Sequence, residues 1–114
     1  MNERETKLTV ERSRFIAYVA PANSLEQVKT LLSKRKRAVK KASHHCWAAR
    51  FSDGQELCRD DGEVGKPGQR ILEVLRQHDI EGVLIVSRVF GGVKLGPAGV
   101  GRAFRDAARA VVRA

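Results

Sequence analysis

The sequence predicts an α+β domain with the element order β-α-β-β-α-β-α. Residues 83–86 form a continuous apolar run rich in β-branched side chains, which is typical of a strand covered on at least one face. Ser24 followed by Gln27 is a capping box that marks the start of a helix. Asp53-Gly54 is a dipeptide favoured in tight β-hairpin turns. The length of 114 residues suits a single domain over 1–114.

Residues 7–19 alternate between apolar and polar side chains, but the parity changes midway. Leu8 and Val10 occupy even positions, whereas Phe15, Ala17 and Val19 occupy odd ones. A one-residue slip sends side chains to the opposite face of a sheet, so a bulge near residues 12–13 would reconcile the two halves. We therefore predict one bent strand or two short ones.

The first helix leads into a dense run of basic residues. Leu25, Val28 and Leu31 fall on one helical face. Residues 34–41 then contain six cations, more than the helix dipole requires at a C-terminus: Lys34, Arg35, Lys36, Arg37, Lys40 and Lys41. With a formal net charge of +9, this run predicts affinity for RNA or the ribosome that falls with salt. The alternative is a solvated connection.

A hairpin is predicted from residues 43–51 and 56–59 around a two-residue turn. That register places residue 49 opposite 58 and residue 46 opposite 61. Cys46 and Cys58 then lie on opposite faces, so we expect two free thiols and a reducing compartment.

The same register predicts that Asp61 lies beside Cys46, with His44 on the same face. These three residues are the candidate catalytic set, as a thiol activated by an imidazole. A closed zinc site would need four ligands, and the sequence has no C-x-x-C pair, so we predict no metal. In the simpler alternative, Cys46 is a small buried side chain and His44 is hydrogen-bonded at the sheet surface.

Two loops flank the second helix, whose apolar face includes Ile71 and Leu75. The first loop carries Asp60, Asp61 and Glu63, which we expect to cap that helix or pair with the basic run of residues 34–41 rather than bind a cation. The second follows Phe90 and allows close approach to a ligand, or only a tight connection, through Gly91, Gly92, Gly96, Gly99 and Gly101. Neither loop matches a phosphate-binding or dinucleotide fingerprint, so no cofactor is predicted.

The last helix has one apolar and one cationic face. The cationic stripe of this helix and two cations near the glycine loop are further candidate nucleic-acid contacts. The loop cations are Arg88 and Lys94, and the stripe consists of Arg102, Arg105 and Arg109, with Arg113 continuing it. No apolar run is long enough for a membrane span, and the N-terminus lacks a signal-peptide pattern. We therefore expect a cytoplasmic protein without a membrane partner.

Several segments together resemble the IMPACT family, also called YigZ-like. They are Ser13-Arg14-Phe15-Ile16-Ala17, Ala42-Ser43-His44, Asp60-Asp61-Gly62-Glu63, Ile71-Leu72-Glu73-Val74-Leu75 and Phe90-Gly91-Gly92-Val93-Lys94-Leu95-Gly96. The resemblance implies a two-layer α/β sandwich, with helices on one face of a four-stranded mixed sheet, similar to the second domain of a small-subunit ribosomal protein. It also implies that the chain is the family core alone. Eukaryotic members restrain an amino-acid-starvation kinase by competing for its ribosome-bound activator.

The leading hypothesis is a non-enzymatic RNA- or ribosome-binding module in the regulation of translation or the stress response. A second is a protein-interaction adaptor in which the glycine loop and Phe90 dock a partner, such as a translation-regulating protein. A third is an enzyme that uses His44, Cys46 and Asp61. A shared fold alone does not decide among them.

Overall fold

The computed structural model describes residues 2–114. It contains five strands and three helices: β1 (Arg4–Val10), β2 (Ser13–Ala20), α1 (Leu25–Ala38), β3 (His44–Arg50), β4 (Glu56–Arg59), α2 (Pro67–Gln77), β5 (Gly82–Val89) and α3 (Gly96–Arg113). The strands form one sheet in the order β1-β2-β5-β3-β4, and every neighbouring pair is antiparallel. The α+β class is confirmed. The prediction of four strands in a mixed sheet is wrong.

The additional strand comes from the N-terminal region, which folds as a hairpin. Val10 pairs with Ser13 across a two-residue turn, and the turn residues Glu11 and Arg12 have φ of 48° and 68°. Two consecutive positive φ angles define the turn type whose twist suits a hairpin. The change of parity is therefore caused by a turn between two strands and not by a bulge within one strand. The element order becomes β-β-α-β-β-α-β-α.

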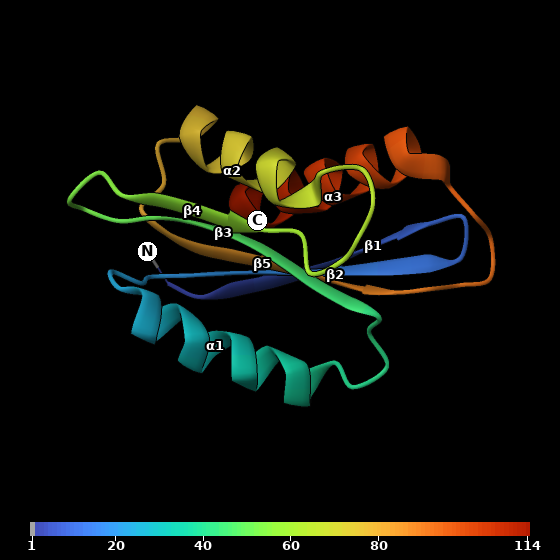
Figure 1. Cartoon of the computed structure of the whole chain (residues 1–114), viewed down its shortest axis with the longest axis horizontal. Coiled ribbons are helices and arrows are strands. Elements are labelled where there is room, and N and C mark those ends of the chain that lie inside the picture. The colour runs from blue at the N-terminus through green and yellow to red at the C-terminus, as the bar shows by residue number, and fades with distance from the viewer. Residues whose placement is uncertain (1) are drawn as a thin grey trace.

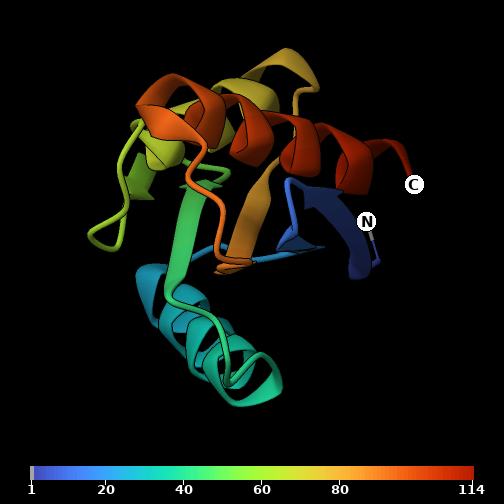
Figure 2. The same ribbon diagram turned by 90° about the vertical axis from the view of Figure 1, so that its right-hand side faces the viewer.

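The helices cover both faces of the sheet, so the molecule has three layers. Figure 1 shows α1 on one side and α2 with α3 on the other, and the turned view in Figure 2 agrees. The predicted single helical layer is wrong. Seven consecutive residues of β5, from 82 to 88, are buried, and such a strand needs apolar cover on both faces.

Two separate cores result from this arrangement. Under α2 and α3, the rings of Phe15 and Phe104 meet edge to face with centroids 5.1 Å apart. The core under α1 is smaller. Val28 is the one apolar side chain of this helix that is fully buried in it. Arg35 completes the contact, with its guanidinium 4.6 Å above the Tyr18 ring centroid. The helix that carries the basic run is thus held by a small interface.

The β3–β4 hairpin has a three-residue loop, so the predicted register is wrong by one residue. Ala48 lies opposite Cys58, and the Phe51 N–H donates to the Gln55 carbonyl at 2.9 Å. Gly54, the third loop residue, takes the left-handed conformation that such loops require, with φ of 91°. Cys58 consequently lies on the same face as Cys46, and both are free thiols.

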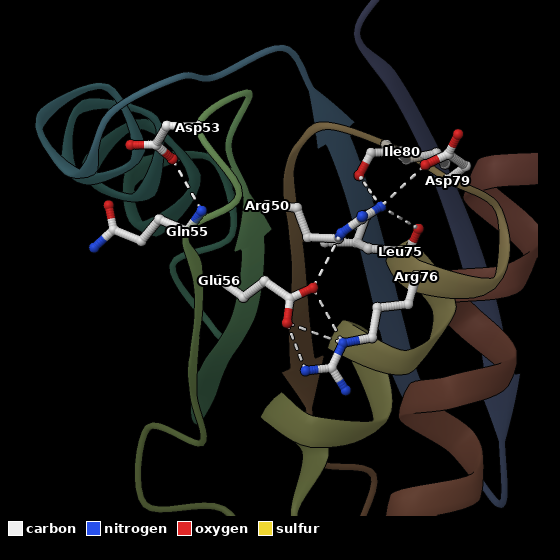
Figure 3. A network of polar contacts seen from close by, with 8 residues as sticks. All are labelled: Arg50, Asp53, Gln55, Glu56, Leu75, Arg76, Asp79 and Ile80. Atoms are coloured by element: carbon white, nitrogen blue, oxygen red, sulfur yellow. Dashed lines mark hydrogen bonds and ion pairs between the residues drawn. The ribbon is translucent and has the colours of Figure 1, made fainter.

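A polar network ties this hairpin to the end of α2 (Figure 3). Arg50 donates from Nε to Glu56 Oε2 at 3.1 Å, and Arg76 donates from Nη2 to Glu56 Oε1 at 2.6 Å. Arg50 Nη1 also reaches the carbonyls of Leu75 and Ile80, each at 3.4 Å. Cations near the last carbonyls of a helix are favoured by its dipole. The network therefore fixes the β3–β4 hairpin to the C-terminal end of α2.

The longest described helix is α3, with 18 residues. Phe104, Ala108 and Val111 are buried on one side, whereas Arg102 and Arg113 are exposed on the other. Across residues 2–114, no helix combines the length and the apolar character that crossing a bilayer would require.

Candidate functional site

Several chain segments meet at the end of the sheet opposite the polar network. They are the start of β3, the acidic loop at residues 60–66, the end of β5 and the loop that leads from it to α3 (Figure 2). Together they line a cavity of about 480 Å³, which we call the β5 pocket. Its walls include His44, Val64, Arg88, Phe90 and Lys94.

The predicted glycine loop is shorter than expected because α3 already begins at Gly96. Gly99 and Gly101 therefore lie inside the helix. At Gly91 a side chain is excluded, since a Cβ there would lie 2.1 Å from the Arg12 carbonyl oxygen. This contact brings the end of β5 directly against the β1–β2 turn.

Arg88 forms a buried inner wall of the pocket. Its Nη1 donates to Glu63 Oε2 at 3.1 Å, and the two side chains are 7% and 5% exposed. Its guanidinium lies 5.6 Å from the Phe15 ring centroid and 5.5 Å from that of Phe90. The prediction that Arg88 is a nucleic-acid contact needs correction, because this side chain is committed to an internal ion pair.

The acidic loop is held by internal hydrogen bonds. Asp60 Oδ1 accepts from the Gly68 N–H at 2.8 Å, in the first turn of α2, and Asp61 Oδ2 accepts from the His45 N–H at 2.7 Å. The expected capping role is confirmed for Asp60. Nowhere in residues 2–114 do three or more His, Cys, Asp or Glu side chains gather as a metal site would require.

The candidate catalytic set is not assembled as the sequence suggested. The thiol of Cys46 donates to the Asp60 carbonyl at 3.1 Å. His44 Nδ1 contacts the Asp61 carbonyl oxygen at 2.8 Å, and its Nε2 lies 3.6 Å from Glu63 Oε2. The corrected hairpin register moves the Asp61 carboxylate to the His45 amide. In the described part of the chain, the Cys46 thiol therefore contacts a backbone carbonyl, and the His44 imidazole contacts other groups.

The pKa of Cys46 is raised far above its ordinary value, first by burial and then by the carboxylates of Glu63 and Asp61. Since only the thiolate is an efficient nucleophile, we expect Cys46 to resist iodoacetamide near neutral pH in the folded protein and to react after denaturation. Peptide mass spectrometry would measure each thiol, with half-buried Cys58 as the internal comparison. Rapid native alkylation of Cys46 would contradict this assignment.

His45 was not singled out by the sequence patterns. It is 8% exposed, its Nδ1 lies 2.7 Å from Ser87 Oγ, and burial lowers its pKa. A neutral imidazole is therefore favoured under the C-terminal half of α1. Val64 was missed as well, although an apolar residue within an acidic and glycine-rich loop was a usable signal.

The basic residues divide into exposed and internal ones. Arg35 is 9% exposed and its Nη2 pairs with Glu5 Oε1 at 2.5 Å, so its predicted role as a nucleic-acid contact needs correction. The other cations of that run are all exposed, and we call them the α1 cluster: Lys34, Lys36, Arg37, Lys40 and Lys41.

The arginine stripe of α3 lies on the opposite side of the sheet from α1. Arg102 is exposed, but Arg105 and Arg109 are half-buried, and Arg105 pairs with Asp106 at 3.3 Å. Exposed Lys94 lies at the β5 pocket, near the start of this helix. The α1 cluster is therefore the densest group of accessible cations in the described part of the chain.

These features define a class of protein: a small basic α+β domain with helices on both faces of an antiparallel sheet and a pocket at one end. The Impact N-terminal domain profile matches residues 11–112. The chain therefore belongs to the IMPACT family, as its motifs predicted.

An IMPACT family member encoded in the pol 5′ region of Thermus thermophilus is 36% identical over 105 residues, 91% of this chain and 57% of the relative. A crystal structure described as a hypothetical protein superimposes with a TM-score of 0.92 at 26% identity, covering 98% of this chain and 57% of the other. The structure of the two-domain translational regulator Yih1 gives a TM-score of 0.58 at 28% identity, covering 96% and 45%. The chain thus spans about half the length of the bacterial relatives it matches.

Proposed function

We propose that this chain is an RNA- or ribosome-associated module that acts in the regulation of translation or the stress response. Membership of the IMPACT family and the likeness to Yih1, described as a translational regulator, support a role in translation. The observation that carries the RNA contact is the exposed α1 cluster. Such a role would place the protein in the cytoplasm, with the ribosome or a translation-regulating protein as its partner.

The α1 cluster has little opposing charge nearby in the sequence. No Asp or Glu occurs between residues 27 and 52. Glu5 does contact this helix, but it forms its ion pair with Arg35. The five exposed cations therefore remain accessible to a polyanion. A polyanion that neutralises several of them releases counterions, so its binding should weaken steeply as salt rises.

Charge reversal of Lys34, Lys36 and Arg37 to glutamate is expected to weaken RNA binding at least tenfold at low salt. The same variant should show a shallower dependence of affinity on salt, because fewer phosphates are neutralised. Fluorescence anisotropy with labelled RNA, repeated over a salt series, would measure both effects. Arg35 is left unchanged because it holds α1 on the sheet.

The matched control reverses Arg105, Arg109 and Arg113 of α3, which changes the net charge by the same amount on the other side of the sheet. Its effect should be smaller, because two of these side chains are half-buried. An α1 variant that binds like the wild type would refute the proposed contact, and so would equal losses in the two variants.

The exposure of Phe90 favours a second candidate, the protein-interaction adaptor. Phe90 is 49% exposed at the rim of the β5 pocket. Sedimentation of the protein with ribosomes at low and high salt, with and without nuclease, separates the candidates. Association that nuclease and salt abolish supports RNA, whereas association that survives both supports a protein partner.

A further inference from the structure

We propose that the β5 pocket binds one unpaired nucleotide of a single-stranded RNA segment, with the base against Phe90 and the phosphate at Lys94 and the first turn of α3. This inference rests on the proposed function, since it specifies which part of an RNA enters which site. It predicts a preference for single strands that the α1 cluster alone would not produce.

The apolar wall of the pocket suits a planar base. Among residues 2–114 the exposed large apolar side chains are Leu25, Val64 and Phe90, at 38%, 51% and 49%. Two of the three, Val64 and Phe90, line this one cavity, together with Leu95 and Val100. A volume of about 480 Å³ is within the range of small-ligand sites, which are mostly apolar with a few polar groups.

The Phe90 ring has a well-ordered neighbour in the pocket wall. The Arg88 guanidinium lies 5.5 Å from its centroid and is itself fixed by Glu63. A ring ordered before binding loses less conformational freedom when a base stacks on it. Stacking on an aromatic ring is the usual way in which proteins hold single-stranded bases, and it tolerates any sequence.

The other wall favours an anion. Leu95, Gly96 and Pro97 line the pocket and begin α3, so the positive end of this helix borders the cavity. The hydrocarbon side chain of Leu95 cannot cap the helix, and its first turn carries no acid.

Two cationic side chains lie at this wall, and in the described part of the chain Lys94 is the one whose charge is not already paired. Lys94 is exposed at the pocket, and Arg88 lines it although it is only 6% exposed. The Nε of Arg88 has no hydrogen-bond partner within residues 2–114. Since Arg88 already balances the Glu63 carboxylate, Lys94 and the helix end remain to attract a phosphate.

The pocket lies close to the C-terminal end of the α1 cluster. Ser43 lines it and follows exposed Lys41 by two residues, which limits their separation to about 7 Å. An RNA strand bound at Lys40 and Lys41 is therefore within reach of the cavity, and Figure 2 shows the chain running from the end of α1 into β3. A cavity of about 650 Å³ at the other end of the sheet has Glu81 as its charged lining residue and does not suit a polyanion.

Only an unpaired base can enter such a site, because bases in a duplex are stacked and paired. The first test is anisotropy with a short labelled RNA, alone and annealed to its complement. Wild type should bind the single strand more tightly, and Phe90→Ala should lose about tenfold on the single strand alone. Phe90→Trp should retain the preference, and Lys94→Gln should lower the salt slope by about one.

The second test is a titration with AMP followed by amide resonances. Shifts are expected at residues 91–96 and at Val100, and Phe90→Ala should abolish them. Leu25→Ala removes an exposed apolar side chain outside the pocket and serves as the control for both tests. Thermal melts would verify that each variant is folded.

The outcomes separate this inference from the proposed function. If the α1 variant loses RNA binding while Phe90→Ala keeps the single-strand preference, the pocket proposal is overturned and the function stands. If the wild type binds no RNA at low salt, the function fails, and the AMP titration alone decides whether the pocket binds a nucleotide. AMP shifts confined to the α1 cluster, or no shifts at all, overturn the pocket.

Discussion

Replacing Arg88 with methionine is expected to lower the free energy of unfolding by about 3 kcal/mol, more than a hundredfold in the folding equilibrium. The side chain of Glu63 is 5% exposed, so without Arg88 its carboxylate would stay buried, and its polar neighbours within residues 2–114 would be only the His44 imidazole, 3.6 Å away, and the Val64 amide. The substitution also removes the guanidinium that lies 5.6 Å from the Phe15 ring centroid and 5.5 Å from that of Phe90. Chemical denaturation with matched m-values would measure the loss.

A double variant distinguishes loss of the pair from loss of packing. Arg88→Met with Glu63→Leu should recover at least half of the lost stability, because no charge remains buried. The control Arg105→Met breaks the more exposed pair with Asp106 and should change stability by less than about 1 kcal/mol. A loss below about 1 kcal/mol for Arg88→Met would show that Glu63 finds water or another donor in the folded state.

Replacing Gly65 with alanine is expected to destabilise the protein by about 3 kcal/mol. Two costs combine, since Gly65 has φ of 86° and a Cβ there would lie 2.3 Å from the Pro97 carbonyl oxygen and 2.9 Å from the Gly101 nitrogen. The positive φ costs about 1 kcal/mol for a residue with a side chain, and displacing a backbone neighbour costs about 2 more. Thermal and denaturant unfolding would give the value.

Gly62 provides the matched control within the same loop. Its φ of 75° is similar, but a Cβ there would meet nothing within 4 Å. Gly62→Ala should therefore cost only about 1 kcal/mol, which isolates the contribution of the close approach at Gly65. Equal losses at the two glycines would mean that the acidic loop moves away from α3 without cost.

Both predictions concern the support of the β5 pocket. Arg88 contacts the Phe90 ring, and Gly65 lets the acidic loop lie directly against the first turns of α3. A pocket held by a buried ion pair and by backbone contacts keeps its shape before a ligand arrives. A binding site with that rigidity loses less conformational entropy when it is occupied.

Most elements of the fold were predictable from local patterns. The apolar run of β5, the capping residues Ser24 and Gln27, and the apolar face of α2 each act within a few residues, and each is present in the structure. The hairpin at Asp53-Gly54 was also predicted, but with the wrong loop length. That error reversed the face of Cys58, because side chains alternate with a period of two.

The candidate site was predictable in its motifs but not in its contacts. The sequence pointed to the right loops, yet it could not tell that Arg88 and Arg35 are internal while the other cations of their segments are exposed. The local sequence around a basic residue does not show whether its side chain is solvated or paired with a carboxylate far away in the chain. Glu63 lies 25 residues from Arg88, and Glu5 lies 30 residues from Arg35.

Sequence alone was sufficient for the family, the α+β class and the cationic character, since composition, local periodicity and motif spacing carry all three. Only the tertiary structure decided that helices cover both faces, that the sheet is antiparallel with five strands, and that four segments close around a pocket. The physical reason is the distance along the chain between the interacting residues. Helix caps and turns depend on neighbours in the chain, whereas layers, ion pairs and cavities depend on which distant segments pack together.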